Sequence, residues 1–168
     1  YRNNGYLAAQ VEPIIQRTRG PDGEPVVDVT WQIREGSPFF INRVIIEGNT
    51  YTHESVIRDQ LVVLPGDLYS DDRLIQSYRS LSALGFFETP LPEPDIIPDL
   101  LSGTVDVVFR VKEKQTGSIN FGTSIGGGGY GRAGGLSGFL GYSQPNLFGQ
   151  AKQASLQAEY GFGRSSFT

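Results

Sequence analysis

The stretch from Val105 to Ile125 constrains the fold more than any other, because two strands of different character meet in it across a short charged link. As far as Val111, apolar side chains occupy every second position, which is the pattern of a strand with one face in a core. After Gln115 the alternation restarts, with small and polar residues on its second side. We expect a water-soluble domain to end at the link and a different kind of sheet to begin beyond it.

Composition changes at the same point. Residues 1–114 contain 17 acidic and 11 basic side chains, a net charge of −6, and eight glycines. Residues 115–168 contain one acidic and three basic side chains, a net charge of +2, and 14 glycines in 54 residues, against an average of ~7%. The total charge of −4 argues against nucleic-acid binding, which needs a basic surface. The absence of cysteine excludes disulfides and thiolate metal sites, and no apolar run reaches the ~18 residues of a transmembrane helix.

The first 36 residues predict the end of a domain. Their opening, YRNNGY, is typical of a helix end, with Gly5 in the left-handed cap position. A short strand is expected from about Ala8 to Ile15, and a turn-forming segment from Arg17 to Pro25. Alternation from Val27 to Ile33 predicts a half-buried strand with Trp31 in the core. Because the chain opens and closes inside such patterns, we expect it to belong to a longer protein.

An internal repeat of nearly 80 residues organises the chain. VDVTWQIRE at residues 27–35 matches VDVVFRVKE at residues 105–113 at an offset of 78, and shorter matches occur at offsets of 77 and 80. A drift of this size is what changes in loop length produce. We therefore expect the end of one repeat at residues 1–36, a complete repeat at residues 37–114 and a different part at residues 115–168.

The complete repeat predicts the order strand, helix, helix, strand, strand. Phe39 to Glu47 is rich in β-branched and aromatic residues and predicts a strand, closed by a turn at Gly48 and Asn49. Thr52 is expected to cap a first helix. The second helix is expected to begin after Ser70, with acidic residues in its first turn, and to end at Gly85. Three elements follow: a strand beginning at Phe86 and Phe87, a proline-rich loop from Pro90 to Pro98, and the closing strand from Val105.

The last third predicts strands long enough to cross a membrane. Thr116 to Ile125 is ten residues, within the ~9 to 11 that a tilted strand needs. Leu136 to Tyr142 is a weaker strand, and Asn146 to Gln150 is a turn. Ala154 to Phe162 alternates most clearly, with its apolar side facing lipid and its polar side facing a wet interior.

Three sequence features could indicate a chemical site, but a structural role explains each of them better. Residues 126–131 contain GxGxxG, but no helix follows, so we expect a flexible hairpin and no dinucleotide. His53, the only histidine, is interpreted as a solvated residue at a helix start. Asp67, Asp71 and Asp72 lack the glycine and terminal glutamate of a calcium loop and suit a helix start. The sequence therefore predicts no catalytic residue, no metal site and no cofactor.

The predicted order of elements, together with three motifs, resembles a POTRA domain. The motifs are Gly48 with Asn49, the run Leu84, Gly85, Phe86 and Phe87, and VDVVFRVKE. TGSINFGTSIG from Thr116 and SQPNLFGQ from Ser143 resemble the first barrel strands of the BamA-like outer-membrane assembly factors, in which tandem POTRA domains precede a transmembrane β-barrel. The resemblance implies an α+β POTRA domain (β-α-α-β-β), preceded by the end of another POTRA domain and followed by about three antiparallel barrel strands.

The resemblance also implies a non-enzymatic function: binding, folding and inserting β-barrel proteins into the outer membrane. The first barrel strand would pair with an incoming strand through backbone hydrogen bonds. Its residues are Gly117, Ser118, Ile119, Asn120, Phe121, Gly122, Thr123, Ser124 and Ile125. Glycine in this region either weakens packing so that a gate can open or permits strong curvature, and both explanations stay open.

The implied partners are nascent outer-membrane proteins, periplasmic accessory lipoproteins and outer-membrane lipid. Neither nucleic acid nor a small-molecule substrate is expected. The POTRA part would lie in the periplasm and the strands in the cell outer membrane. An accessory-protein contact is expected at Arg58, Pro65 and Gly66, where Pro65 replaces an acidic residue of proteobacterial relatives.

Two alternatives remain. One is a two-partner-secretion-type outer-membrane transporter of the same superfamily, which the number of POTRA repeats in the full chain would distinguish. The other is a soluble periplasmic scaffold module, in which residues 116–168 would stay soluble and ordered without detergent.

Overall fold

The computed structural model describes residues 1–125, 135–161 and 164–167, and its contacts divide the chain into two compact units. The first unit contains Tyr1–Glu47, Leu61–Ser80 and Pro92–Arg110. The second contains Gly48–Gln60, Leu81–Leu91 and Val111–Thr168. The GxGxxG segment lies outside the described residues.

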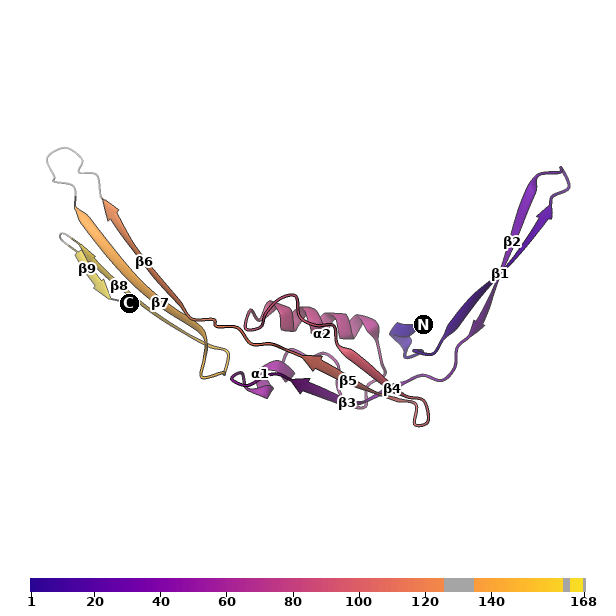
Figure 1. Cartoon of the computed structure of the whole chain (residues 1–168), viewed down its shortest axis with the longest axis horizontal. Helices are drawn as coiled ribbons and strands as arrows, with labels where there is room; N and C mark the ends of the chain where they lie inside the picture. Colours follow the sequence, from indigo (N-terminus) through magenta and orange to yellow (C-terminus); the bar gives the residue numbers. More distant parts are fainter. Residues whose placement is uncertain (126–134, 162–163, 168) are drawn as a thin grey trace. The chain divides into compact units, whose positions relative to one another are not determined.

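The first unit begins with one helical turn and a long hairpin. The 3-10 turn η1 spans Arg2–Asn4 and ends at Gly5, whose φ of 84° is left-handed, as the sequence predicts. β1 (Gln10–Arg19) and β2 (Pro25–Arg34) pair antiparallel over their whole length (Figure 1).

The hairpin corrects two expectations from the sequence. The strand expected to end at Ile15 stays paired as far as Arg19, so the turn is confined to the residues between Gly20 and Glu24, where the Gly20 amide donates to the Glu24 carbonyl at 2.9 Å. Trp31 was expected in a core but is 59% exposed. Within the described residues this two-stranded ribbon pairs with no third strand, and every residue of both strands is exposed.

A three-stranded sheet forms the second part of the first unit. β3 (Phe40–Glu47) runs parallel to β5 (Thr104–Arg110), and β4 (Asp95–Asp99) runs antiparallel to β5, in the order β3-β5-β4 (Figure 1). β4 overlaps the end of the segment from Pro90 to Pro98 that was expected to be a proline-rich loop. An edge strand can accommodate Pro98, because one side of its backbone needs no partner.

A β-bulge in β3 decides which of its side chains face the core. The register with β5 shifts between Ile41 and Arg43. The extra residue lets both Ile41 and Val44 be buried, at 2% and 5% exposure. Asn42 and Arg43 instead both donate hydrogen bonds to the Asp106 carboxylate, at 2.9 and 3.0 Å. The sequence predicts this strand but not the bulge.

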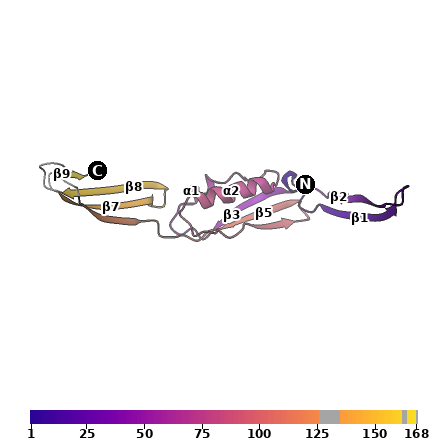
Figure 2. The same cartoon turned by 90° about the horizontal axis from the view of Figure 1, so that it is seen from above.

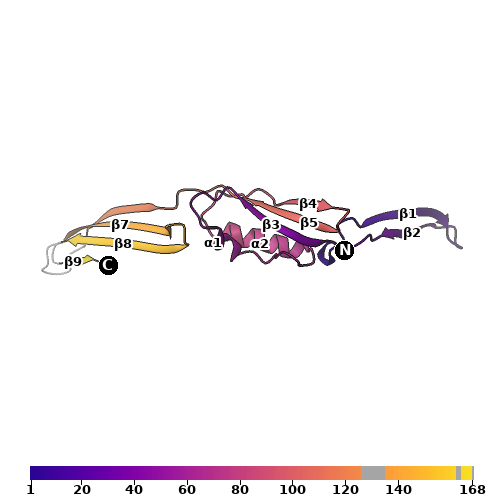
Figure 3. The same ribbon diagram turned by 90° about the horizontal axis from the view of Figure 1, so that it is seen from below.

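Helix α2 (Asp71–Ala83) lies along one face of this sheet, as Figures 2 and 3 show from opposite sides. Its first ten residues belong to the first unit. Asp71 and Asp72 occupy the first turn, and Gly85, with a φ of 73°, follows the helix, as the sequence predicts. Leu74 on this helix is buried, at 7% exposure.

Ser77 is a wholly buried polar residue on α2 that the sequence pattern does not reveal. Its hydroxyl donates to the Arg73 carbonyl and accepts a hydrogen bond from the Val62 amide, each at 2.9 Å. The hydroxyl thus provides an acceptor for the backbone amide of Val62, a partly buried residue.

The end of η1 binds the first turn of α2. Asn3 Oδ1 accepts a hydrogen bond from the Asp72 amide at 3.1 Å, and Asn3 Nδ2 donates to the Asp72 carboxylate at 2.6 Å. Arg2 donates twice to the Asp71 carboxylate, at 2.5 and 3.2 Å. Tyr69 also donates to Asp71, and burial, followed by this carboxylate, raises the pKa of Tyr69 to about 12. The contacts of Arg2 and Asn3 join residues that lie 69 positions apart in the sequence.

The second unit contains a short helix and a four-stranded antiparallel sheet. Helix α1 spans Glu54–Arg58. The sheet has the order β6-β7-β8-β9 (Figure 1). Its strands are β6 (Ser118–Ile125), β7 (Leu136–Leu147), β8 (Lys152–Gly161) and β9 (Arg164–Phe167). Among the described residues, no helix has the length and apolar character needed to span a membrane.

Four expectations in this unit need correction. His53, not Thr52, is the N-cap of α1, and no side chain caps the helix. Asn146 lies in β7 and not in a turn, because β7 continues to Leu147. Phe87 forms a single bridge with Glu113 and does not begin a strand. A fourth strand, β9, joins the three that were expected.

Candidate functional site

β6 is the end strand of its sheet. It pairs along its whole length with β7, from Ser118 opposite Ser143 to Ile125 opposite Leu136. Within the described residues its second edge has no partner strand. An unpaired edge presents backbone donors and acceptors to any extended chain that approaches it.

The apolar side chains of β6 are strongly exposed. Ile119 is 68% exposed, and Phe121 and Ile125 are each 82% exposed. These three residues alternate along the strand, so they lie on one face of the sheet. The arrangement agrees with the alternation that the sequence shows.

Gly122 is covered by an aromatic ring. It lies directly opposite Phe139, and a Cβ built on Gly122 would lie 2.5 Å from a ring carbon of Phe139. The ring therefore occupies the space that a side chain at Gly122 would need, as aromatic residues do beside glycines in strands. At Gly117 a Cβ would lie 2.5 Å from the Gln144 side-chain oxygen. Both glycines thus stand where a neighbouring side chain crosses the backbone.

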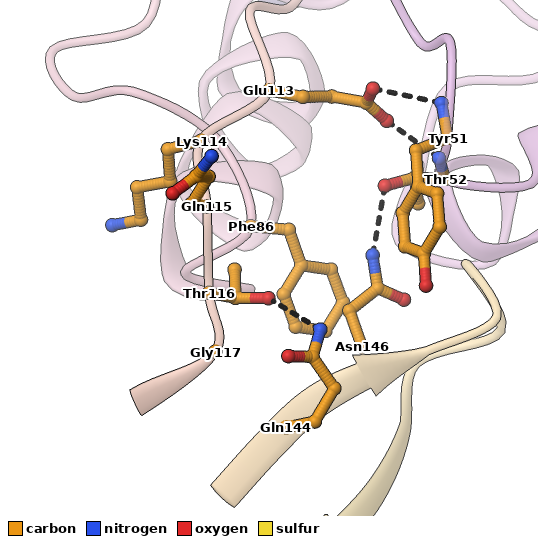
Figure 4. A pocket seen from close by; sticks show the side chains of 10 residues that line it. All are labelled: Tyr51, Thr52, Phe86, Glu113, Lys114, Gln115, Thr116, Gly117, Gln144 and Asn146. Carbon is orange, nitrogen blue, oxygen red and sulfur yellow. Dashed lines mark hydrogen bonds between the residues drawn. The ribbon is translucent and has the colours of Figure 1, made fainter. Parts of the chain in front are cut away.

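Glu113, at the start of the link to β6, holds the loop 48–53. Its carboxylate accepts four hydrogen bonds. The donors are the Thr50 amide at 3.1 Å, the Thr50 hydroxyl at 2.6 Å, the Tyr51 amide at 2.8 Å and the Thr52 amide at 2.6 Å. Figure 4 shows the carboxylate pointing at Tyr51 and Thr52. Burial raises the pKa of Glu113, but the hydrogen bonds from Thr50, Thr52 and Tyr51 outweigh it and lower the pKa to about 2.

Thr52 links this loop to β7. Its hydroxyl accepts a hydrogen bond from Asn146 Nδ2 at 2.9 Å (Figure 4). Thr52 is 3% exposed and Asn146 is 2% exposed. A cavity of about 430 Å³ lies beside these residues, and Thr116 and Gln144, whose side chains are hydrogen-bonded at 3.2 Å, contribute to its wall.

Sequence reasoning missed the roles of Glu113, Thr52 and Asn146. The one available signal was the repeat, which ends in glutamate both times, at Glu35 and at Glu113. Nothing local in the sequence pairs Thr52 with a residue 94 positions away.

The residues of the POTRA motif have structural roles in the second unit. Gly48 has a φ of 94°, and a Cβ there would lie 2.0 Å from the Val111 carbonyl oxygen, so only glycine fits. Asn49 donates to the Thr52 carbonyl at 3.2 Å. Leu84 is half-buried, and Phe86 and Phe87 are 7% and 1% exposed. Both phenylalanines are therefore core residues.

The three residues expected to contact an accessory protein are exposed. Arg58 lies on α1 in the second unit and pairs with Glu54 at 2.6 Å. Pro65 and Gly66 lie in the first unit, where the Gly66 amide donates to the Ile41 carbonyl at 2.7 Å.

The aspartates considered for calcium have other partners. Asp67 accepts hydrogen bonds from Arg73 at 2.6 Å and from the Leu64 amide at 3.1 Å. Asp71 and Asp72 bind the end of η1, as described above. In the part of the chain that the structure describes, no three His, Cys, Asp or Glu residues lie together as metal ligands would.

Comparison with known proteins agrees with this architecture. Residues 39–114 match the POTRA family model, described as a surface antigen variable number repeat. The chain is 33% identical over 99% of its length to the outer membrane protein assembly factor BamA of Nitratidesulfovibrio vulgaris, and 31% identical over 91% of its length to that of Neisseria meningitidis serogroup B. A crystal structure of BamA from Haemophilus ducreyi lacking POTRA domains 1–3 matches 95% of the chain with a TM-score of 0.73 and 25% identity.

The fold and the match over residues 39–114 define a POTRA domain of β-α-α-β-β order, flanked by further strands. The chain belongs to the BamA family, whose members are assembly factors and not enzymes. It spans 20% of the Nitratidesulfovibrio relative, 18% of the Neisseria relative and 28% of the Haemophilus chain.

Proposed function

We propose that this chain is the region of an outer-membrane protein assembly factor in which the last periplasmic POTRA domain meets the membrane-inserted strands, and that it takes part in folding and inserting β-barrel proteins. Residues 1–36 are the end of the penultimate POTRA domain, residues 37–114 are the last, and residues 115–168 are the first barrel strands. The family match over residues 39–114 and the relatives that bear the name of an assembly factor support this division.

The similarity to assembly factors over 99% and 91% of the chain carries the proposal, and β6 is the strand at which we place the contact with clients. Its backbone is paired on one side only, within the described residues, and Ile119, Phe121 and Ile125 project from it with 68 to 82% exposure. An incoming strand can extend the sheet there by adding ladder hydrogen bonds, which need no particular client sequence. The exposed apolar side chains are suited to contact with lipid hydrocarbon. Because backbone groups in hydrocarbon must all be hydrogen-bonded, the unpaired edge of β6 needs a partner strand there.

The partners follow from this role. Nascent outer-membrane proteins pair with β6, outer-membrane lipid surrounds the strands, and accessory lipoproteins bind the periplasmic part at Arg58, Pro65 and Gly66. Each of these residues is exposed, as a contact at that residue requires.

Site-specific photo-crosslinking tests the proposal in the full chain during assembly of a radiolabelled client barrel protein. A photoreactive residue replaces Ile119, Phe121 or Thr123 on β6, and matched controls carry it at Leu156 or Tyr160 on β8. We expect client adducts at the β6 positions and none on β8. Equal labelling of β6 and β8 would contradict strand pairing at this edge. Ordered, detergent-free behaviour of residues 116–168 would instead favour the soluble scaffold.

A further inference from the structure

The loop 48–53 touches the turn between β7 and β8 without an intervening side chain. Gly149, in that turn, has a φ of 69°, and a Cβ built on it would lie 2.0 Å from the Tyr51 carbonyl oxygen. The His53 amide donates to the Gly149 carbonyl at 2.9 Å. The backbones therefore approach each other as closely as they do within a sheet, and only glycine permits it.

Asn146 adds a buried polar link at the same place. Its Nδ2 donates to the Thr52 hydroxyl at 2.9 Å, and its Oδ1 accepts the Ala151 amide at 2.9 Å. One side chain thus holds the loop on one side and closes the turn on the other. Because Thr52 and Asn146 are almost wholly buried, loss of either partner would leave a polar group without compensation.

The loop is fixed on its other side as well. Glu113 accepts three of its amides and one hydroxyl, and Gly48 lies against the Val111 backbone. The loop is therefore held between the segment 111–113 and the turn 146–151. A displacement of one of these segments cannot be absorbed by the loop unless these hydrogen bonds break.

We propose that the loop 48–53 and the turn 146–151 form a rigid joint that makes α1 and the strand pair β7–β8 move as one body. The joint positions β7, the strand on which β6 is paired, and so sets the orientation of the open edge. This consequence rests on the proposed function, whereas the joint itself does not.

Pulsed electron paramagnetic resonance measures the joint directly. The chain has no cysteine, so spin labels can be placed at S55C on α1 and Q153C on β8, two exposed positions. In the full chain in lipid vesicles we expect one narrow distance distribution that does not change when a client barrel protein is added. N146A and the shape-preserving T52V are expected to widen the distribution at least twofold, and the control Q157A on β8 is expected to leave it unchanged.

A wide distance distribution in the parent chain would contradict the proposed joint. Distance distributions of equal width in the parent chain and in both joint variants would contradict it as well. Hydrogen exchange provides a second measurement if N146A folds poorly. T52V should accelerate exchange of the His53 amide about tenfold while the Tyr51 amide, held by Glu113, stays protected. Equal protection of His53 in both proteins counts against the joint. Neither measurement depends on insertion activity, so failure of the joint and failure of the proposed function are distinguishable.

Discussion

Replacement of Glu113 by glutamine removes the negative charge that holds the loop 48–53 while keeping the size of the side chain. The folded pKa of about 2 lies ~2.5 units below the ordinary value of 4.5. At ~1.36 kcal/mol per unit this difference corresponds to roughly 3 kcal/mol. Glu113 is partly exposed, so solvent screening reduces the expected loss to about 2 kcal/mol.

The pH dependence follows from the sign of the shift. Because the folded pKa is lowered, the stabilisation is fully present above about pH 4.5 and is lost as the pH falls toward 2. Hydrogen exchange at the Tyr51 and Thr52 amides measures it locally. E113Q should reduce their protection about 30-fold at pH 7, since ~1.4 kcal/mol is a factor of ten. The difference from the parent chain should shrink steadily below pH 4.5.

A control with the same chemical change is E88Q, because Glu88 pairs with Lys112 at 2.9 Å on the surface. Such exposed pairs contribute less than ~1 kcal/mol, so E88Q should leave the Tyr51 and Thr52 amides protected. Unchanged protection in E113Q at pH 7, or a difference as large at pH 2.5 as at pH 7, would refute the role assigned to this carboxylate.

Three further substitutions test other contacts. Ser77→Ala leaves the Val62 amide without its acceptor and should lower the free energy of unfolding by ~1–3 kcal/mol in denaturant titrations of the full chain. Asn3→Ala removes the acceptor of the Asp72 amide and should cost ~1 kcal/mol, measured as faster exchange of that amide; an unchanged rate would show that the contact does not persist in solution. Gly122→Ala places a methyl group 2.5 Å from the Phe139 ring, so the ring must move, and its NMR shifts should change while those of Phe86 do not.

Much of the POTRA fold could be predicted from the sequence, because its signals are local. Alternation marks β5, and acidic residues and a glycine mark the two ends of α2. The exposed face of β6 follows from the same alternation. What escaped prediction depends on partners distant in the chain: β4 is a strand because it pairs with β5, and the bulge at Asn42 is visible only in its register with β5.

In the candidate site, too, features with local sequence signals could be predicted and features that depend on distant partners could not. The edge strand could be located from its composition and period, whereas the anchoring of the loop 48–53 could not. Thr52 has the residue type of a helix cap, but its amide binds Glu113 and its hydroxyl binds Asn146, 61 and 94 positions away. Tertiary contacts therefore override the local preference.

The contact of Asn3 and Arg2 with the first turn of α2 restricts how such repeats can be recombined. On the division of the chain proposed above, a capping group for one module comes from the tail of the module before it, so a copy placed behind a foreign neighbour would lose that group. The order of the modules along the chain therefore depends on matching side chains at their boundaries. Duplication or shuffling of these repeats during evolution would require matching changes at both ends.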